Sequence, residues 1–175
     1  MTMRFLGSKM HKYYARVNTP ASHISKFYGL PRLSKLDWLD FEGFAGNLVP
    51  EEIWSKVGFL EAVRGRYPES LAIIMRLDPG TAYLWHKDVD RTFTINMLLH
   101  RNGHSHTVFG EDQTEFTSKI TELDYEPEYL YIFNTQEKHE VYNLDEYRYL
   151  FTMKIITEDS YEDILRWAGD EGWLD

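Results

Sequence analysis

The sequence predicts a mainly β protein with flanking α-helices, folded as a double-stranded β-helix, the jelly roll of cupin-like proteins. Short runs of β-branched and aromatic residues recur between about residues 71 and 157. Turn signals rich in proline, glycine and asparagine separate these runs, and helical periodicity is confined to the flanks. A βαβ fold would instead alternate strands with long helical segments.

The 175 residues fit one domain, within which we expect no boundary. Residues 1–70 should form an irregular and helical support, residues 71–157 the jelly-roll core, and residues 158–175 a C-terminal helix. The first fifty residues combine chain breakers with scattered aromatic rings, so we expect loops and short elements there.

One helix is predicted to begin after Pro50, where two glutamates face the positive end of the helix dipole, and to run to about Tyr67 before Pro68. Apolar residues recur in it at helical spacing: Ile53, Val57, Leu60 and Val63. Such a helix would buttress a sheet.

The first half of the core should contain four strands: Leu71–Leu77, Tyr83–Asp88, Arg91–Leu99 and His104–Phe109. The segment Asp78–Thr81 has proline and glycine where a tight turn needs them. Asn102-Gly103 is a hairpin signal between the last two of these strands.

Four further strands are predicted in the second half: Phe116–Leu123, Tyr129–Phe133, His139–Asn143 and Arg148–Thr157. In the last, apolar side chains alternate along the strand: Tyr149, Phe151, Met153 and Ile155. Ser160 or a neighbouring acid should then cap a short C-terminal helix.

The composition excludes several classes of protein and site. Acidic residues exceed basic ones by 28 to 19, and the net charge of −9 opposes binding to nucleic acid or to an anionic membrane. Because the chain has no cysteine, a metal site would have to use histidine, aspartate or glutamate. There is no signal-peptide pattern and no run of about 18 apolar residues, so we expect a cytoplasmic protein.

His86 and Asp88 are the first candidates for chemistry. Side chains at i and i+2 of a strand point to the same face, so this imidazole and carboxylate converge. They supply two ligands of the 2-His-1-carboxylate facial triad, which binds Fe(II) and leaves positions open for substrate and dioxygen. His139, between a turn and a strand, is the candidate third ligand. Arg148, nine residues later, could grip a carboxylate as a bidentate fork.

These residues and their setting resemble the Fe(II)- and 2-oxoglutarate-dependent oxygenases with a double-stranded β-helix fold. The likeness covers about Leu71 to Ile156 and rests on three features: His86-Lys87-Asp88, His139 and Arg148. Two segments that precede the histidines look most like the branch related to aspartyl/asparaginyl β-hydroxylases: Leu77–Thr81 and Phe133–Thr135.

The resemblance implies that His86, Asp88 and His139 bind iron and that Arg148 pairs with the distal carboxylate of 2-oxoglutarate. Three residues would be further contacts of this cosubstrate: Arg91, Asn96 and Tyr83. The implied reaction uses O₂ and hydroxylates a C–H bond while 2-oxoglutarate becomes succinate and CO₂. Aspartyl/asparaginyl β-hydroxylases proper are expected to lack the carboxylate ligand that Asp88 offers, so their substrate is not transferred. A small molecule and a peptide or protein side chain both stay open as substrates.

The same sequence features allow three alternative interpretations. Taken singly, the residues have structural interpretations: a surface carboxylate like Asp90 for Asp88, a bond to a backbone carbonyl for His139, a surface ion pair with Asp145 or Glu146 for Arg148, and core packing for Tyr83. A rival three-histidine site of a cupin-like enzyme without an oxoacid would combine His100, His104 and His106 across the predicted hairpin. It ranks lower because a hairpin tip is exposed. A binding module of the same fold that has lost chemistry is the third alternative.

Overall fold

The computed structural model describes residues 12–41, 44–100, 104–114 and 117–174 of the chain. Its strands are β1 (Tyr14–Pro20), β2 (Leu39–Phe41), β3 (Phe44–Leu48), β4 (Leu71–Leu77), β5 (Thr81–His86), β6 (Phe93–Leu98), β7 (Ser105–Thr114), β8 (Thr117–Glu122), β9 (Tyr129–Asn134), β10 (His139–Asn143) and β11 (Arg148–Lys154). Its helices are α1 (Ser22–Phe27), α2 (Leu30–Leu33), α3 (Glu51–Trp54), α4 (Gly58–Arg66) and α5 (Tyr161–Asp170).

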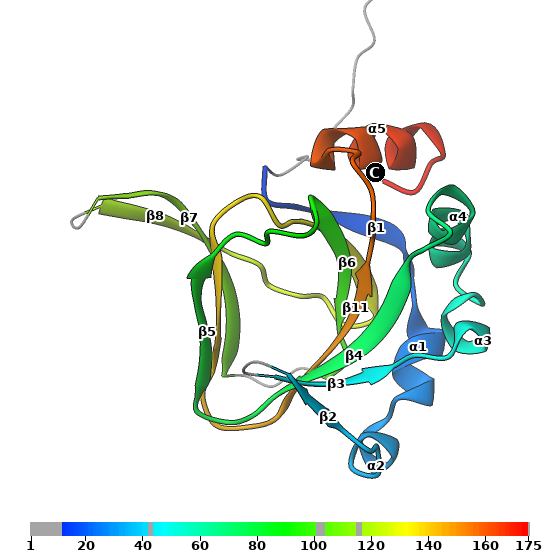
Figure 1. The fold of residues 1–175 in the computed structure, drawn as a ribbon, viewed down its shortest axis with the longest axis horizontal. Coiled ribbons are helices and arrows are strands. Elements are labelled where there is room, and N and C mark those ends of the chain that lie inside the picture. The colour runs from blue at the N-terminus through cyan, green and yellow to red at the C-terminus, as the bar shows by residue number, and fades with distance from the viewer. Residues whose placement is uncertain (1–11, 42–43, 101–103, 115–116, 175) are drawn as a thin grey trace, which may run out of the picture.

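The strands form two antiparallel sheets that face one another (Figure 1). The large sheet has the order β1-β9-β6-β11-β4-β3-β2, and the small sheet has the order β5-β10-β7-β8. From β4 onwards the chain passes repeatedly between them, with β4, β6, β9 and β11 in the large sheet and β5, β7, β8 and β10 in the small one. This arrangement is the predicted double-stranded β-helix, so the fold class is confirmed.

The central strand β11 of the large sheet is buried on both of its faces. Phe151 and Met153 point to the outer face, where they pack in one core with residues of α1, α3, α4 and α5. The helices therefore lie outside the sheet, as predicted (Figure 1). Arg148 and Leu150 alternate with them and point to the inner face, which looks toward the small sheet.

The turn that the sequence predicts at Asp78–Thr81 carries the chain from the large sheet to the small one. Gly80 adopts a φ of +72°, a conformation that favours glycine, and its N–H donates to the Leu144 carbonyl at 2.9 Å. The hydroxyl of Thr81 donates to the Asp78 carbonyl at 2.6 Å. β5 begins at this turn and ends at His86, the first candidate ligand.

The first fifty residues contain more sheet than the sequence indicates. We expected loops and short elements, but β1 pairs with β9 and β3 pairs with β4, so both extend the large sheet. The sequence of β3, Phe-Ala-Gly-Asn-Leu, contains residues that are depleted in strands. Pairing with the strong strand β4 therefore overrides a weak local preference.

The helix expected from Pro50 to Tyr67 is wrong in one respect, since it is two helices. α3 ends at Trp54, and Val57 has extended backbone angles at the N-cap of α4. Gly58 follows the break, where an added Cβ would lie 3.4 Å from the ring of Trp173. The interruption lets the apolar residues of both helices reach the core: Ile53, Trp54, Val57, Phe59, Leu60 and Val63.

The hairpin predicted at Asn102-Gly103 is also wrong. These two residues lie outside the described ranges, but the strands on either side of them, β6 and β7, belong to different sheets. The connection is therefore a crossover between layers. β7 pairs instead with β8 and β10.

The C-terminal helix follows its prediction closely. Ser160 is the N-cap of α5, its hydroxyl accepts from the N–H of Asp163 at 3.2 Å, and the Asp163 carboxylate accepts from the N–H of Ser160 at 3.0 Å. This reciprocal pair is a capping box. Within the described residues, no helix is long and apolar enough to cross a membrane.

Candidate metal centre and anion pocket

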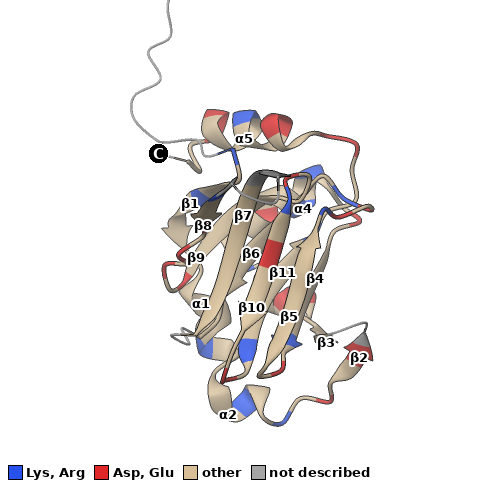
Figure 2. Ribbon diagram, turned by 90° about the vertical axis from the view of Figure 1, so that its left-hand side faces the viewer, with Lys and Arg blue, Asp and Glu red and all other residues tan. Residues whose placement is uncertain are grey.

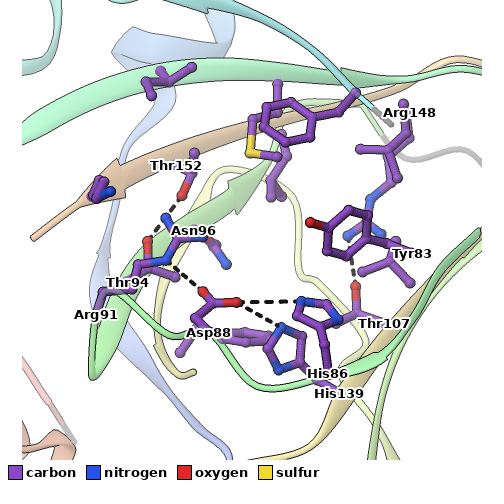
Figure 3. A pocket seen from close by; sticks show the side chains of 18 of the residues that line it. Tyr83, His86, Asp88, Arg91, Thr94, Asn96, Thr107, His139, Arg148 and Thr152 are labelled. Atoms are coloured by element: carbon purple, nitrogen blue, oxygen red, sulfur yellow. Dashed lines mark hydrogen bonds and ion pairs between the residues drawn. The ribbon is translucent and has the colours of Figure 1, made fainter. Parts of the chain in front are cut away.

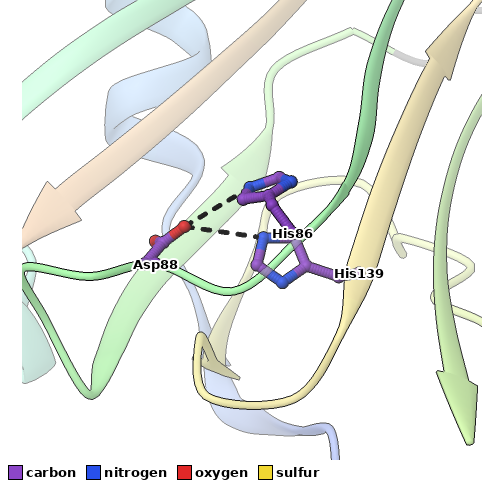
Figure 4. A group of neighbouring side chains, drawn as sticks. All are labelled: His86, Asp88 and His139. Carbon is purple, nitrogen blue, oxygen red and sulfur yellow. Dashed lines mark ion pairs between the residues drawn. The ribbon is translucent and has the colours of Figure 1, made fainter. Parts of the chain in front are cut away.

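His86, Asp88 and His139 come together as the sequence predicts (Figure 4). His86 is the last residue of β5, Asp88 follows two residues beyond it, and His139 begins β10 opposite His86 in the antiparallel register. One ligand atom from each side chain lies within 4.8 Å of the others. Among the described residues, these three form the one group of this kind.

Both histidines are held in the tautomer that a metal ligand needs. The Nδ1–H of His86 donates to the Leu84 carbonyl at 2.7 Å, and the Nδ1–H of His139 donates to the Glu137 carbonyl at 2.9 Å. Each ring therefore keeps its Nε2 lone pair free. The expected structural role of His139, a bond to a backbone carbonyl, is thus compatible with a ligand role.

Asp88 offers one oxygen to the two rings and the other to Arg91. Its Oδ1 lies 3.4 Å from Nε2 of His86 and 3.8 Å from Nε2 of His139, while its Oδ2 accepts from Nε of Arg91 at 2.5 Å. Arg91, which the resemblance makes a candidate contact of the cosubstrate, thus lines the cavity and pairs with Asp88. Asp90, the alternative carboxylate, pairs with Lys154.

The charges of the three groups suit cation binding. Burial would raise the pKa of Asp88, but His86, Arg91 and His139 outweigh it and lower this pKa to about 2. Burial lowers the pKa of His139 to about 4. Burial also acts to lower the pKa of His86, but Asp88 and the Leu84 carbonyl raise it overall. At neutral pH the group thus holds an ionised carboxylate and a neutral His139.

A set of backbone contacts ties the two ligand-bearing segments together. The N–H of Asp88 donates to the Thr135 carbonyl at 3.0 Å, and the hydroxyl of Thr135 donates to the Arg91 carbonyl at 2.7 Å. The side-chain amide of Gln136 donates to the carbonyls of Asp88 at 3.0 Å and Arg91 at 2.8 Å. Asp88 and His139 are therefore placed by one connected unit.

A cavity of about 300 Å³ lies between the two sheets and contains this group in its wall (Figure 3). Its walls combine apolar side chains such as Met75 and Leu150 with many polar and charged ones, among them Asn96 and Arg148. Tyr83 lines it and packs edge-on against His86, with ring centroids 4.5 Å apart, so its side chain is not a core residue. The buried Asn96, another candidate contact of the cosubstrate, also lines the cavity.

Arg148 is buried in the same cavity, with 2% of its surface exposed. Its Nη2 donates to the hydroxyl of Thr107 at 2.7 Å, but its Nε and Nη1 have no hydrogen-bond partner. The expected alternative, a surface ion pair with Asp145 or Glu146, is therefore wrong. Burial lowers the pKa of Arg148, yet a guanidinium stays charged in proteins. A buried cation with two unused donors on an open cavity fits a carboxylate.

The surroundings of Arg148 include residues that the sequence did not single out. The ring of Tyr125 lies 5.8 Å from the guanidinium carbon, and burial raises the pKa of Tyr125 to about 12, so its hydroxyl stays protonated. Asn96 has its Oδ1 without a hydrogen-bond partner. Tyr125 sits in a loop without periodicity, and Thr107 carries no motif, so no sequence signal points to either.

The rival three-histidine site is not assembled. His104 pairs with Asp145, and Nδ1 of His106 lies 2.6 Å from Oε1 of Glu122 on the exposed outer face of the small sheet. His100 instead contacts the Tyr28 carbonyl at 3.2 Å. These rings therefore do not converge on one point.

The residues present fit a divalent transition metal and an anionic ligand. Two imidazoles and one carboxylate make the donor set typical of non-haem Fe(II) sites. The unpaired donors of Arg148 would match a carboxylate group of a ligand that reaches the metal.

Comparisons with known proteins bear on the fold. No protein-family model and no curated protein matches the chain. A prolyl-4-hydroxylase structure from Pseudomonas putida is similar with a TM-score of 0.64 and 10% identity, over 85% of this chain and 95% of that one. A prolyl hydroxylase structure from Trichoplax adhaerens, in complex with a hypoxia inducible factor oxygen degradation domain peptide fragment, gives 0.60 and 15%, over 83% and 84%.

A third similar structure is an oxidoreductase of the 2OG-Fe(II) oxygenase family from Burkholderia pseudomallei, with a TM-score of 0.50 and 15% identity over 71% of this chain and 75% of that one. At such identities the likeness establishes the fold alone. None of the three is described as an aspartyl/asparaginyl hydroxylase. The chain therefore has the jelly-roll fold seen in structures of 2-oxoglutarate- and Fe(II)-dependent oxygenases.

Proposed function

We propose that this protein is an Fe(II)- and 2-oxoglutarate-dependent dioxygenase that hydroxylates a C–H bond of its substrate. One observation carries the proposal: the same cavity holds a two-histidine, one-carboxylate group and a buried arginine with two unused donors. Either feature alone has structural explanations. Together they match a cosubstrate that must bind a metal at one end and a cation at the other.

Each residue has a definite task in this proposal. Nε2 of His86, Nε2 of His139 and Oδ1 of Asp88 would hold the metal, while Arg91 keeps Oδ2 of Asp88 turned away from it. Nε and Nη1 of Arg148 would bind the distal carboxylate of 2-oxoglutarate. The proposal therefore assigns Arg91 to ligand orientation.

Other side chains would complete the cosubstrate pocket. The protonated hydroxyl of Tyr125 and the amide of Asn96 would offer hydrogen bonds beside the guanidinium. Apolar walls that include Met75 and Leu150 would keep water from the reacting atoms. Bound Fe(II) and 2-oxoglutarate would supply the oxidation, in which O₂ gives one atom to the C–H bond and one to the succinate formed with CO₂.

The proposed reaction does not by itself define the class of substrate. The similar structure from Trichoplax adhaerens carries a peptide fragment, which supports a peptide or small-molecule substrate for this fold. The resemblance of the sequence to aspartyl/asparaginyl β-hydroxylases is carried no further, because those are expected to lack a counterpart of Asp88.

The test is spectroscopic and then catalytic. Anaerobic addition of Fe(II) and 2-oxoglutarate should produce a visible charge-transfer band that His139→Ala abolishes. Admission of air should release succinate even without substrate, at a slow uncoupled rate. A protein that binds both but releases no succinate would be a binding module, and a protein that binds metal but gives no band would be a metal enzyme without an oxoacid.

A further inference from the structure

The inner face of the large sheet continues beyond the cavity onto strands that the small sheet does not cover. The small sheet ends at β5, whereas β3 and β2 project past that edge (Figure 2). The cross-strand register puts the inner-facing side chains of β2, β3 and β4 on the same face as Arg148. We call this set the apolar shelf: Leu39, Phe44, Leu48, Leu71, Ile73 and Met75.

The apolar shelf runs from solvent into the cavity. Phe44, Ile73 and Met75 line the cavity, while Leu48 and Leu71 flank Ile73 and are 65% and 50% exposed. Leu48 lies opposite Ile73 in the register, so apolar surface is continuous at this point. Exposed apolar surface that is contiguous with a pocket marks a binding site more often than a scattered surface leucine does.

The other side of the cavity mouth is a strand edge. Within the described residues, β5 pairs with β10 alone, so its second edge carries no strand. Tyr83 and His86 of β5 line the cavity together with Phe44, Ile73 and Met75 of the apolar shelf. The mouth therefore has backbone groups on one side and apolar side chains on the other.

We propose that the substrate is an extended polypeptide segment that lies along the apolar shelf beside the edge of β5. The inference rests on the proposed function and names its substrate class. An extended segment can form main-chain hydrogen bonds with a free strand edge and place alternate side chains in pockets. Shelf residues on one strand, such as Leu71 and Ile73, are two positions apart, the spacing at which side chains of an extended peptide repeat on one face.

The cavity argues against a long alkyl chain as the occupant. Its interior carries the Arg148 guanidinium, the Tyr125 hydroxyl and the Asn96 amide. An alkyl chain would remove water from these groups without offering them hydrogen bonds. The volume of about 300 Å³ is also shared with a five-carbon diacid. The space left over suits one side chain, so most of the substrate must lie outside on the shelf. The net charge of −9 further opposes an anionic lipid surface.

The test uses binding as its primary readout. Protein loaded with Mn(II) and 2-oxoglutarate is titrated into an array of short fluorescent peptides, half of them with apolar residues at alternate positions and half with the same composition scrambled. The alternating peptides should bind preferentially. Leu48→Asp and Leu71→Asp should weaken that binding roughly tenfold each, since each removes burial of one leucine. Both residues are exposed, so both variants should fold, which urea unfolding checks.

Ile120→Asp is the matched control, because Ile120 is 53% exposed on β8 of the small sheet, away from the mouth. It should bind peptides as the wild type does. The inference is overturned by unchanged peptide binding in the shelf variants, by binding of palmitate but of no peptide, or by a dimer that the shelf substitutions dissociate. Uncoupled succinate release, measured on the same proteins, reports on the proposed function separately, because peptide binding is read without turnover.

Discussion

The cavity has two polar regions that differ in how far the protein completes them. Around Asp88, every charge has a partner: Arg91 holds one oxygen and both histidines face the other. Around Arg148, a buried cation has one neutral partner and two unused donors. The charges of the first region compensate one another, whereas the charge of the second would be compensated only by a bound anion. Removal of the Asp88 carboxylate should therefore leave Arg91 without this partner, whereas removal of the Arg148 charge should stabilise the ligand-free protein.

The largest expected effect is loss of the metal site. Asp88→Ala should abolish binding of Fe(II) or Mn(II), because it removes both a ligand and the negative charge that offsets Arg91. Asp90→Ala is a close control, since this neighbouring carboxylate pairs with Lys154 and belongs to no ligand set in the described residues. Isothermal titration with Mn(II) measures both. Equal losses in the two variants would contradict the assignment of Asp88.

The second effect separates function from stability at Arg148. Arg148→Met should weaken 2-oxoglutarate binding roughly 30- to 1000-fold, from the loss of a buried charge-assisted pair worth about 2–4 kcal/mol. The same substitution should raise the free energy of unfolding of the ligand-free protein by about 1–3 kcal/mol, because it removes an uncompensated buried charge. Urea unfolding measures the second quantity, with exposed Arg166→Met as the control. Destabilisation by Arg148→Met would mean that the guanidinium is already compensated.

A smaller effect should follow when hydrogen bonds between the segments that carry Asp88 and His139 are removed. Gln136→Glu keeps the size of the side chain but removes the amide donor to the carbonyls of Asp88 and Arg91. We expect metal affinity to fall about tenfold, the usual scale for groups that position a ligand. Gln136→Ala should behave in the same way, and an unchanged affinity in both variants would show that the backbone contacts of Thr135 suffice.

A further effect is a pH dependence of metal affinity. A proton on Nε2 of either histidine competes with the metal. Burial keeps the pKa of His139 at about 4, so this ring is neutral above about pH 5. The pKa of His86 is raised, because Asp88 and the Leu84 carbonyl outweigh burial. Affinity should thus fall as pH drops below the pKa of His86, by about tenfold per unit, with the slope of one proton. A two-proton slope between about pH 5 and 7 would contradict the state of His139.

Sequence patterns identify the core of the fold and bring out the three candidate ligands, but they do not show the packing around them. The His-x-Asp spacing and a histidine at the start of a strand are local signals, and they find all three ligand candidates. The role of Arg91 depends on the bend of the chain after β5, which no periodicity encodes. Tyr125 and Thr107 reach Arg148 only because β7 and the loop before β9 lie beside β11 in space.

The errors in the fold have a similar physical origin. A hairpin signal such as Asn102-Gly103 describes a turn, but which sheet receives the next strand depends on contacts far along the chain. Gly58, which follows the break between α3 and α4, lies against Trp173, more than a hundred residues away. The strand β3 exists because β4 offers it an edge.

Odd- and even-numbered side chains of strand β11 lie on opposite faces of the large sheet and have different surroundings. Its odd-numbered side chains, such as Phe151 and Met153, pack beneath the helices, while β4 and β6 pair with its two edges. Its even-numbered side chains, from Arg148 to Lys154, face the cavity, where Leu150 packs in the smaller core and Thr152 forms a hydrogen bond with Thr94. Substitutions at the even-numbered positions of β11 should therefore change the pocket while leaving the outer packing of the strand in place.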